Sequence, residues 1–171
     1  AEDGIRDSVA SRGLGDVYKR QVEESARTLS TLYNTFSQEG AEISRCINVA
    51  LEAPRDAQPE TVESLGKGWV AEEALSIALY ACLATKNLDG GLQCAIIHSG
   101  DSDSTGAIAG NLLGVLYPNE VFAHPLLHNL GGRNIIEQLA VDLVSSRNWS
   151  LEEAAHRRNN YPHNSIGTDH V

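Results

Sequence analysis

Apolar residues recur at helical spacing along most of the chain, and this periodicity is the feature that most limits the possible folds. Residues 26–36, 43–51 and 71–84 each show one apolar face with the period of an α-helix. In the last segment, AEEALSIALYACLA, Glu72 and Glu73 stand in the first turn, where the helix dipole favours acidic side chains. The sequence gives no convincing hairpin signal and no internal repeat. The pattern therefore predicts an all-α fold.

One apolar stretch leaves helix and strand both open. The run LQCAIIH, at residues 92–98, is too short for its periodicity to decide between them. Two prolines, Pro54 and Pro59, interrupt the helical pattern, and a glycine-rich loop is expected at residues 66–69. Further helices are predicted at residues 61–65, 108–116, 135–144 and, with a capping box formed by Ser150 and Glu153, at 150–156.

The first 21 residues differ from the rest of the chain. Residues 1–7 read AEDGIRD and residues 11–21 read SRGLGDVYKRQ, and both resemble the translation of sequencing-adapter DNA, with a sample barcode between them. The segment also lacks the apolar core of a signal peptide. We therefore expect residues 1–21 to be a non-native leader without packed contacts to the remaining chain, and the native N-terminal part of the protein to be missing.

Composition limits the class of protein further. The 171 residues are 42% hydrophobic and 21% charged, which suits one compact domain. A formal net charge of -10 argues against binding to nucleic-acid backbones or anionic membranes. The longest apolar stretches are shorter than the roughly 20 residues that span a bilayer. Because Cys46, Cys82 and Cys94 lie inside apolar helical patterns, we expect reduced thiols in a soluble, cytoplasmic protein. The oligomeric state is not predicted.

The motif that carries chemistry is HSGDSDSTGAIAGNLLG, at residues 98–114. Asp101 and Asp103 stand two positions apart in a turn of small residues that leads into a helix. Hard cations such as magnesium take oxygen ligands, so this pair with a neighbouring hydroxyl can face one ion. Asp103 or Ser104 is expected to cap the helix, whose free amides can hold an anion such as a pyrophosphate. The turn is therefore a candidate cation site.

Other interpretations of the sequence remain open or are excluded by spacing. A calcium loop needs an acid at its twelfth position, which is Leu112 when counted from Asp101. A phosphatase of the haloacid dehalogenase type also has an apolar strand followed by Asp-x-Asp-x-Thr, as in AIIHSGDSDST, and a helix-capping turn without any ligand is a further alternative. His124 and His128 have the spacing of zinc ligands but lack the glutamate that such a motif places between them.

The run GDSDSTGAIAGNLLG resembles the C-terminal signature of the ADP-ribosylglycohydrolase family, and LGKGWVAEEALSIALYACL, at residues 65–83, resembles the loop and helix that precede it. The order of the segments follows the family from residue 22 to about residue 144. The resemblance implies an orthogonal helical bundle around two Mg²⁺ ions, with Mn²⁺ as an alternative metal. It also implies hydrolysis of the N- or O-glycosidic bond that links ADP-ribose to a protein or a small molecule.

Carried over residue by residue, the resemblance implies that Asp101 and Asp103 are carboxylate ligands and that Ser104, where many members have threonine, is a hydroxyl ligand. It implies substrate contacts for Gly66, Gly68, Trp69 and Ser102. His98 would orient a ligand carboxylate or a water molecule by a hydrogen bond. From the residues alone, a core anchor is the favoured interpretation of Trp69, and a packed histidine is an equal alternative for His98.

The remaining parts of the family's site do not occur in this sequence. Its other metal ligands come from a Thr-Asp-Asp segment near the N-terminus, close to an acidic residue implicated in catalysis, so the catalytic residue stays unassigned. We expect this chain to supply only the C-terminal ligands and to be inactive alone. The expected divisions are a leader (1–21), the C-terminal part of an ADP-ribosylglycohydrolase domain (22–158) and a polar tail (159–171). A non-catalytic ligand-binding module of the same fold is the alternative.

Overall fold

The computed structural model describes residues 2–35 and 38–153, with side chains described for residues 17–35 and 40–153. In this part of the chain, all the regular secondary structure is helical, which confirms the all-α prediction. The elements are α1 (Glu2–Tyr33), α2 (Gln38–Glu52), α3 (Pro59–Ser64), α4 (Ala71–Ala84), α5 (Leu88–Ile96), α6 (Ser102–Leu116), α7 (Pro118–Ala123), α8 (Pro125–His128), α9 (Arg133–Ser145) and the 3-10 helix η1 (Ser146–Asn148). Phe36, the end of the predicted last helix and the tail lie outside the described residues.

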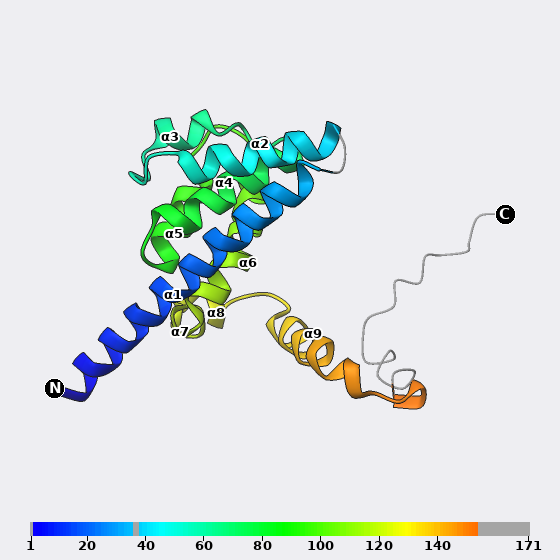
Figure 1. Ribbon diagram of the computed structural model, residues 1–171. Helices are drawn as coiled ribbons and strands as arrows, with labels where there is room; N and C mark the ends of the chain where they lie inside the picture. The colour runs from blue at the N-terminus through cyan, green and yellow to red at the C-terminus, as the bar shows by residue number, and fades with distance from the viewer. Residues whose placement is uncertain (1, 36–37, 154–171) are drawn as a thin grey trace. The chain divides into compact units, whose positions relative to one another are not determined.

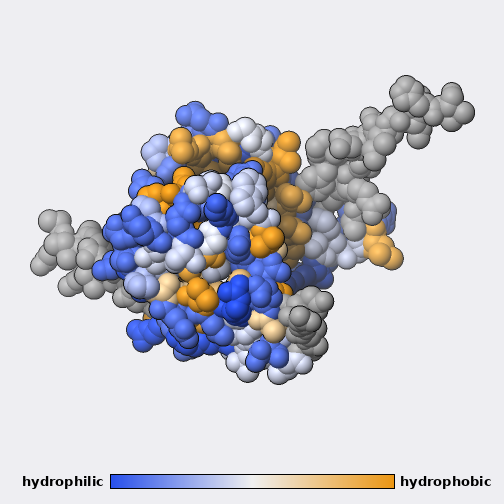
Figure 2. Space-filling view, turned by 90° about the horizontal axis from the view of Figure 1, so that it is seen from above, coloured by the Kyte–Doolittle hydropathy of each residue, from blue (hydrophilic) through white to orange (hydrophobic). Residues whose placement is uncertain are grey.

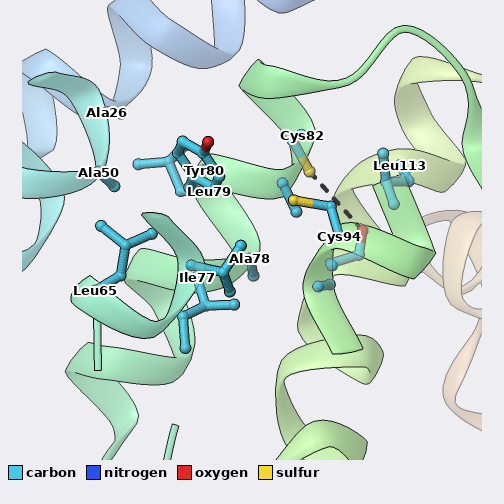
Figure 3. Packing of buried hydrophobic residues seen from close by; sticks show 14 of the residues in the cluster. Ala26, Ala50, Leu65, Ile77, Ala78, Leu79, Tyr80, Cys82, Cys94 and Leu113 are labelled. Carbon is cyan, nitrogen blue, oxygen red and sulfur yellow. Dashed lines mark hydrogen bonds between the residues drawn. The ribbon is translucent and has the colours of Figure 1, made fainter. Parts of the chain in front are cut away.

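The chain forms two compact units, residues 1–123 and residues 124–171. In the first unit, helix α4 contacts α1, α2, α5 and α6 (Figure 1). Ile77, Tyr80 and Cys82 of α4 are fully buried (Figure 3). Burial on several sides explains why this helix is apolar over most of its circumference rather than along one stripe. Helix α4 is thus the centre of the hydrophobic core.

All three cysteines are free thiols in the core, as the helical pattern predicted. Burial raises the pKa of Cys82 to about 12 and that of Cys94 to about 11. The Cys82 Sγ lies 4.0 Å from the carbonyl oxygen of Ala109 on α6 (Figure 3). The thiols therefore act as small packing groups rather than as nucleophiles.

The undecided run at residues 92–98 is helical as far as Ile96, where α5 ends, and continues into the turn before α6. Helix α5 begins after Asn87, whose side-chain oxygen accepts a hydrogen bond from the Gly90 amide at 2.7 Å. On the buried side of α5, Gly91 leaves no room for a side chain because the Leu113 side chain of α6 packs against its backbone. The phosphatase interpretation needs a strand directly before Asp101, so helix α5 contradicts it.

A buried tyrosine fixes the loop between α2 and α3. The Tyr80 hydroxyl donates to the carbonyl oxygen of Pro54 at 2.7 Å and accepts from the Ala57 amide at 3.0 Å. Ala57 has a φ of 52°, in the left-handed region that residues with a Cβ rarely occupy. The hydroxyl of Tyr80 thus stabilises a strained loop conformation at the edge of the core.

Helix α1 continues across the boundary expected after Gln21. Val17 is 45% exposed, in line with a segment that is not part of the core. Lys19, however, donates a hydrogen bond to the Thr85 carbonyl, and Tyr18 and Gln21 line an apolar groove together with core residues. The expectation that residues 1–21 make no packed contact is therefore wrong at the end of the segment, while its adapter origin stays a prediction.

The second unit contains α8, α9 and η1. The predicted capping box is confirmed: Ser150 Oγ accepts from the Glu153 amide at 3.2 Å, and Glu153 Oε2 accepts from the Ser150 amide at 2.9 Å. His124 caps α8 by accepting from the Leu126 amide at 3.3 Å. Across the part of the chain that the structure describes, no three His, Cys, Asp or Glu side chains gather as a metal site.

Large apolar side chains remain exposed on both units. On the first unit they include Leu29, Leu32, Val115 and Phe122, and on the second Ile136, Leu139, Leu143 and Val144. Figure 2 shows apolar patches between hydrophilic ones on one face. Among the described residues, none of the helices combines the length and hydrophobicity needed to cross a membrane.

Candidate metal and substrate site

The candidate site is built on the turn that joins α5 to α6. Asp101 is the N-cap of α6, and its Oδ1 accepts a hydrogen bond from the Ser104 amide at 3.4 Å. The prediction that Asp103 or Ser104 caps this helix is thus wrong, because the helix already begins at Ser102. Asp101 keeps its carboxylate at the helix N-terminus, where the amide dipoles favour negative charge.

The two aspartates lie within hydrogen-bonding reach of each other. The pKa of Asp101 lies below its ordinary value, first because it accepts a hydrogen bond from the Asp103 carboxyl and then because it accepts one from the Ser104 hydroxyl. Asp101 and Asp103 place two carboxylates at the start of α6. A cation between them would offset the repulsion of like charges.

The glycine loop, residues 66–68, lies directly on this turn. The Asp101 amide donates to the carbonyl oxygen of Lys67 at 2.8 Å. A side chain at Gly100 would overlap that same carbonyl, and a Cβ at Gly68 would stand 2.7 Å from Thr105 Cγ2. Both glycines are therefore required by close backbone approach. The structure brings together the loop and the turn that the sequence assigned to one site.

Two of the predicted substrate contacts differ in their surroundings. Trp69 follows the glycine loop and is 69% exposed, so its interpretation as a core anchor is wrong. Ser102 is half-buried, and its hydroxyl makes long hydrogen bonds to the carbonyl oxygens of Ile96 and Gly100, at 3.4 and 3.5 Å. Trp69 thus offers aromatic surface to a ligand, whereas Ser102 contributes to the turn itself.

His98 is buried beneath the turn, with 5% of its surface exposed. Its Nδ1 accepts a hydrogen bond from the Gly100 amide at 3.1 Å, so in the neutral ring Nε2 carries the hydrogen and donates to Thr105 Oγ1 at 2.9 Å. The Thr105 hydroxyl in turn donates to the Ala95 carbonyl at 2.8 Å. These contacts favour the packed-histidine interpretation, because His98 fixes the backbone that carries Asp101.

Sequence reasoning missed two glutamates that hold the site in place. Glu73 Oε2 accepts from the amides of Lys67 and Gly68, at 3.0 and 3.1 Å. Glu63 accepts from the Ser99 amide at 2.7 Å and from its hydroxyl at 3.3 Å, and these hydrogen bonds lower the pKa of Glu63. The signal for Glu73 was its place in the first turn of α4, from which an acidic side chain can reach back to the preceding amides.

The donor set fits part of a magnesium site. Asp101, Asp103 and Ser104 offer two carboxylates and a hydroxyl, the oxygen ligands that magnesium prefers. Magnesium takes about six oxygens in octahedral geometry. Among the described residues no third His, Cys, Asp or Glu joins the pair. These three residues therefore suit one side of a cation, whose other ligands must come from water, substrate or further protein groups.

Fold and site together define a helical domain with a carboxylate turn at the start of a glycine-containing helix. The ADP-ribosylglycohydrolase family model matches residues 7–152, so the chain belongs to this family of glycosidase-type hydrolases. The match begins within the expected leader. Neither a curated protein nor a solved structure matches the chain.

Proposed function

We propose that this protein takes part in hydrolysis of the glycosidic bond between ADP-ribose and a protein or small-molecule acceptor, with Asp101, Asp103 and Ser104 as ligands of a magnesium pair. The observation that carries this proposal is that the glycine loop lies against the turn that holds both aspartates, joined to it by the hydrogen bond from the Asp101 amide to the Lys67 carbonyl. Family membership supports the class of reaction.

The reaction needs positioned charge and an activated water. Breaking the bond at the anomeric carbon builds oxocarbenium-like charge on the ribose, and acid/base assistance lowers the barrier. A magnesium pair held in part by Asp101, Asp103 and Ser104 would orient the ribose hydroxyls and the attacking water. The Asp101 and Asp103 carboxylates hold negative charge at this point, and the exposed Trp69 ring provides aromatic surface for the substrate beside the glycine loop.

The chain as it stands is proposed to be inactive. Its described residues gather only two carboxylates and one hydroxyl at the site, without a third acidic or histidine ligand. Such a set leaves most of the coordination sphere to water, so magnesium affinity should be weak, with a Kd of about 1 mM or higher. The remaining ligands would come from the Thr-Asp-Asp segment that the family carries, and the catalytic acid from an acidic residue close to it.

The experiment compares this chain with a longer chain in which a Thr-Asp-Asp-containing segment of the ADP-ribosylglycohydrolase family is joined before residue 22. Both are incubated with ADP-ribosylated protein and Mg²⁺, and released ADP-ribose is measured by mass spectrometry. The longer chain should release ADP-ribose and its Asp103→Asn variant should not. Absence of release by the longer chain would refute the hydrolase proposal, and release by the present chain would refute its inactivity.

A non-catalytic ADP-ribose-binding module is the second candidate. The incomplete ligand set in the described residues favours it for this chain alone. Calorimetry with ADP-ribose distinguishes the two candidates: a binding module binds ADP-ribose without magnesium and without turnover, whereas the hydrolase site should need the cation for tight binding.

A further inference from the structure

We propose that Glu73 is a positioning residue for the Asp101 carboxylate and acts on it through the peptide group that joins Lys67 to Gly68. This inference rests on the proposed function, because it concerns how well the Asp101–Asp103 pair receives a cation. Glu73 lies on α4, and the aspartates lie at the start of α6. The loop between Leu65 and Trp69 is the physical connection.

The first link is between Glu73 and the loop. A single oxygen, Oε2, accepts hydrogen bonds from the amides of Lys67 and Gly68, at 3.0 and 3.1 Å. The aliphatic part of the Glu73 side chain packs so closely on Gly66 that a Cβ there would lie 2.6 Å from Cγ. Gly66 also has a φ of 126°, which favours glycine. The carboxylate of Glu73 therefore fixes the orientation of two consecutive peptide groups.

The second link passes through one of those peptide groups. The Gly68 N–H and the Lys67 carbonyl belong to the same planar unit, so fixing the N–H direction also fixes the opposite direction of the carbonyl. That carbonyl accepts the Asp101 amide at 2.8 Å. The result is a continuous hydrogen-bonded row from the Glu73 carboxylate, through one peptide group, to the backbone of Asp101. An anion at one end polarises the peptide and strengthens the bond at the other.

The third link is the N-cap itself. Asp101 carries the carboxylate, and its backbone is held on one side by Lys67 and on the other by the start of α6. Glu63 holds Ser99, two residues earlier, through a separate pair of hydrogen bonds. Removal of Glu73 should therefore loosen the Lys67 side of the turn while the Glu63 side stays in place.

The test uses the full chain labelled with ¹⁵N and titrated with Mn²⁺, whose unpaired electrons broaden nearby amide signals even when binding is weak. In Glu73→Ala, the Mn²⁺ concentration that half-broadens the amides of residues 101–104 should rise about fivefold or more, the lower end of a typical coupling between sites. Hydrogen exchange at the Asp101 amide should accelerate in the same variant. Glu73→Gln, which retains an oxygen acceptor, should stay within about twofold of wild type.

The matched control is Glu72→Ala, which removes the same charge from the same turn of α4 but leaves both hydrogen bonds of Glu73 intact. It should leave the Mn²⁺ response unchanged. An equal shift in Glu72→Ala, or a wild-type response in Glu73→Ala, would overturn the inference. Glu73→Asp gives a second test if the alanine variant does not fold, because the shorter side chain cannot reach both amides; a wild-type Mn²⁺ response in this variant would also overturn it.

Failure of the inference and failure of the proposed function are distinguishable. If the wild-type chain responds to Mn²⁺ at residues 101–104 and the Glu73 variants respond equally, only the role of Glu73 is refuted. If the wild-type chain shows no broadening there even at high Mn²⁺ concentration, the metal site fails, and the role of Glu73 fails with it.

Discussion

The backbone amide of Asp101 donates to the carbonyl oxygen of Lys67 at 2.8 Å, and this hydrogen bond joins the glycine loop to the carboxylate turn. The two segments are far apart in sequence, and the contact depends on the absence of a side chain at Gly100. A ligand that contacts the loop and a cation that contacts the turn therefore share one backbone connection. Binding of either should affect the other, because coupling between two sites is reciprocal.

Gly100→Ala should destabilise the protein and disrupt this contact. The added methyl group would overlap the Lys67 carbonyl, and such overpacking costs about 1–3 kcal/mol in the free energy of unfolding. Gly114→Ala is the control, since a Cβ there meets no atom within 4 Å and alanine is favoured over glycine inside a helix by about 1 kcal/mol. Urea unfolding of both variants should show opposite signs; equal effects would mean that the loop moves aside freely.

Tyr80→Phe should lower the free energy of unfolding, because the Tyr80 hydroxyl fixes the loop at the edge of the core. Loss of the hydroxyl removes the hydrogen bonds to the Pro54 carbonyl and from the Ala57 amide, and each such bond contributes about 0.5–1.5 kcal/mol to the free energy of unfolding. Tyr33→Phe, at an exposed position, should change the free energy of unfolding by no more than about 0.5 kcal/mol. Thermal or urea unfolding of the two variants provides the comparison. A Tyr80→Phe variant as stable as wild type would show that water replaces the hydroxyl.

The fold was predictable where one helix carries a long and complete pattern. The bounds expected for the segment 71–84 agree with α4, because its apolar residues, acidic first turn and length all indicate a helix. The sequence could not decide between helix and strand for α5, because the apolar run at residues 92–98 covers only the end of this helix and the turn that follows. Asn87, which caps the helix, lies outside that run. Short helices α7 and α8 have too few residues for any period to appear.

The sequence predicted which residues form the candidate site, but not which residues hold them in place. The Asp101 and Asp103 turn and the Gly66 loop carried recognisable motifs, and the structure brings them together. Glu73 and Glu63 hold these segments through contacts with backbone amides, which any sequence contains at every position except proline. The first-turn place of Glu73 indicated only that its side chain could reach the preceding amides, whereas the contact of Glu63 with Ser99 joins segments 36 residues apart and depends on tertiary packing. The exposure of Trp69 likewise depends on which neighbours surround it, not on its side chain.

Acidification should weaken the hydrogen bonds that Ser99 donates to Glu63. Hydrogen bonds from the Ser99 amide and hydroxyl hold the pKa of Glu63 below its ordinary value of 4.5. A depressed pKa in the folded state contributes stability that is present above the unfolded pKa and lost as pH falls through the folded one. Between about pH 5 and pH 3, wild type should therefore lose more stability than Glu63→Gln. Glu60→Gln, on the same helix, serves as the control; a wild-type pH profile in Glu63→Gln would contradict the assignment.

The buried thiols should resist modification in the folded protein. Because burial raises the pKa of Cys82 to about 12 and that of Cys94 to about 11, both remain protonated at pH 8. A disulfide reagent such as dithionitrobenzoate should react with them only after denaturation. The same shifts predict that stability falls as pH rises above about 9, because the unfolded chain then releases thiol protons that the folded chain retains. Rapid stoichiometric reaction in the native state would contradict this burial.

Asp103→Asn should separate metal binding from helix capping, because the two aspartates differ in their structural roles. Asp101 caps α6 through the Ser104 amide, whereas Asp103 is exposed within the first turn. Neutralising Asp103 removes one of two adjacent negative charges, so stability without metal should stay level or rise slightly. The charge that holds a cation is lost at the same time.

Three variants test this separation in the same chain. Asp103→Asn should lose the Mn²⁺ response at residues 101–104 and keep the unfolding free energy of wild type. Asp101→Ala should lose both, with a destabilisation of about 1 kcal/mol from the missing cap. Asp101→Asn should keep the cap, since asparagine is an equally good N-cap residue, and lose only the response to Mn²⁺. Urea unfolding without metal and Mn²⁺ titration by NMR measure the two properties independently. If Asp103→Asn retains the Mn²⁺ response of wild type, Asp103 is not a ligand, and the carboxylate pair cannot be the metal site proposed for this turn.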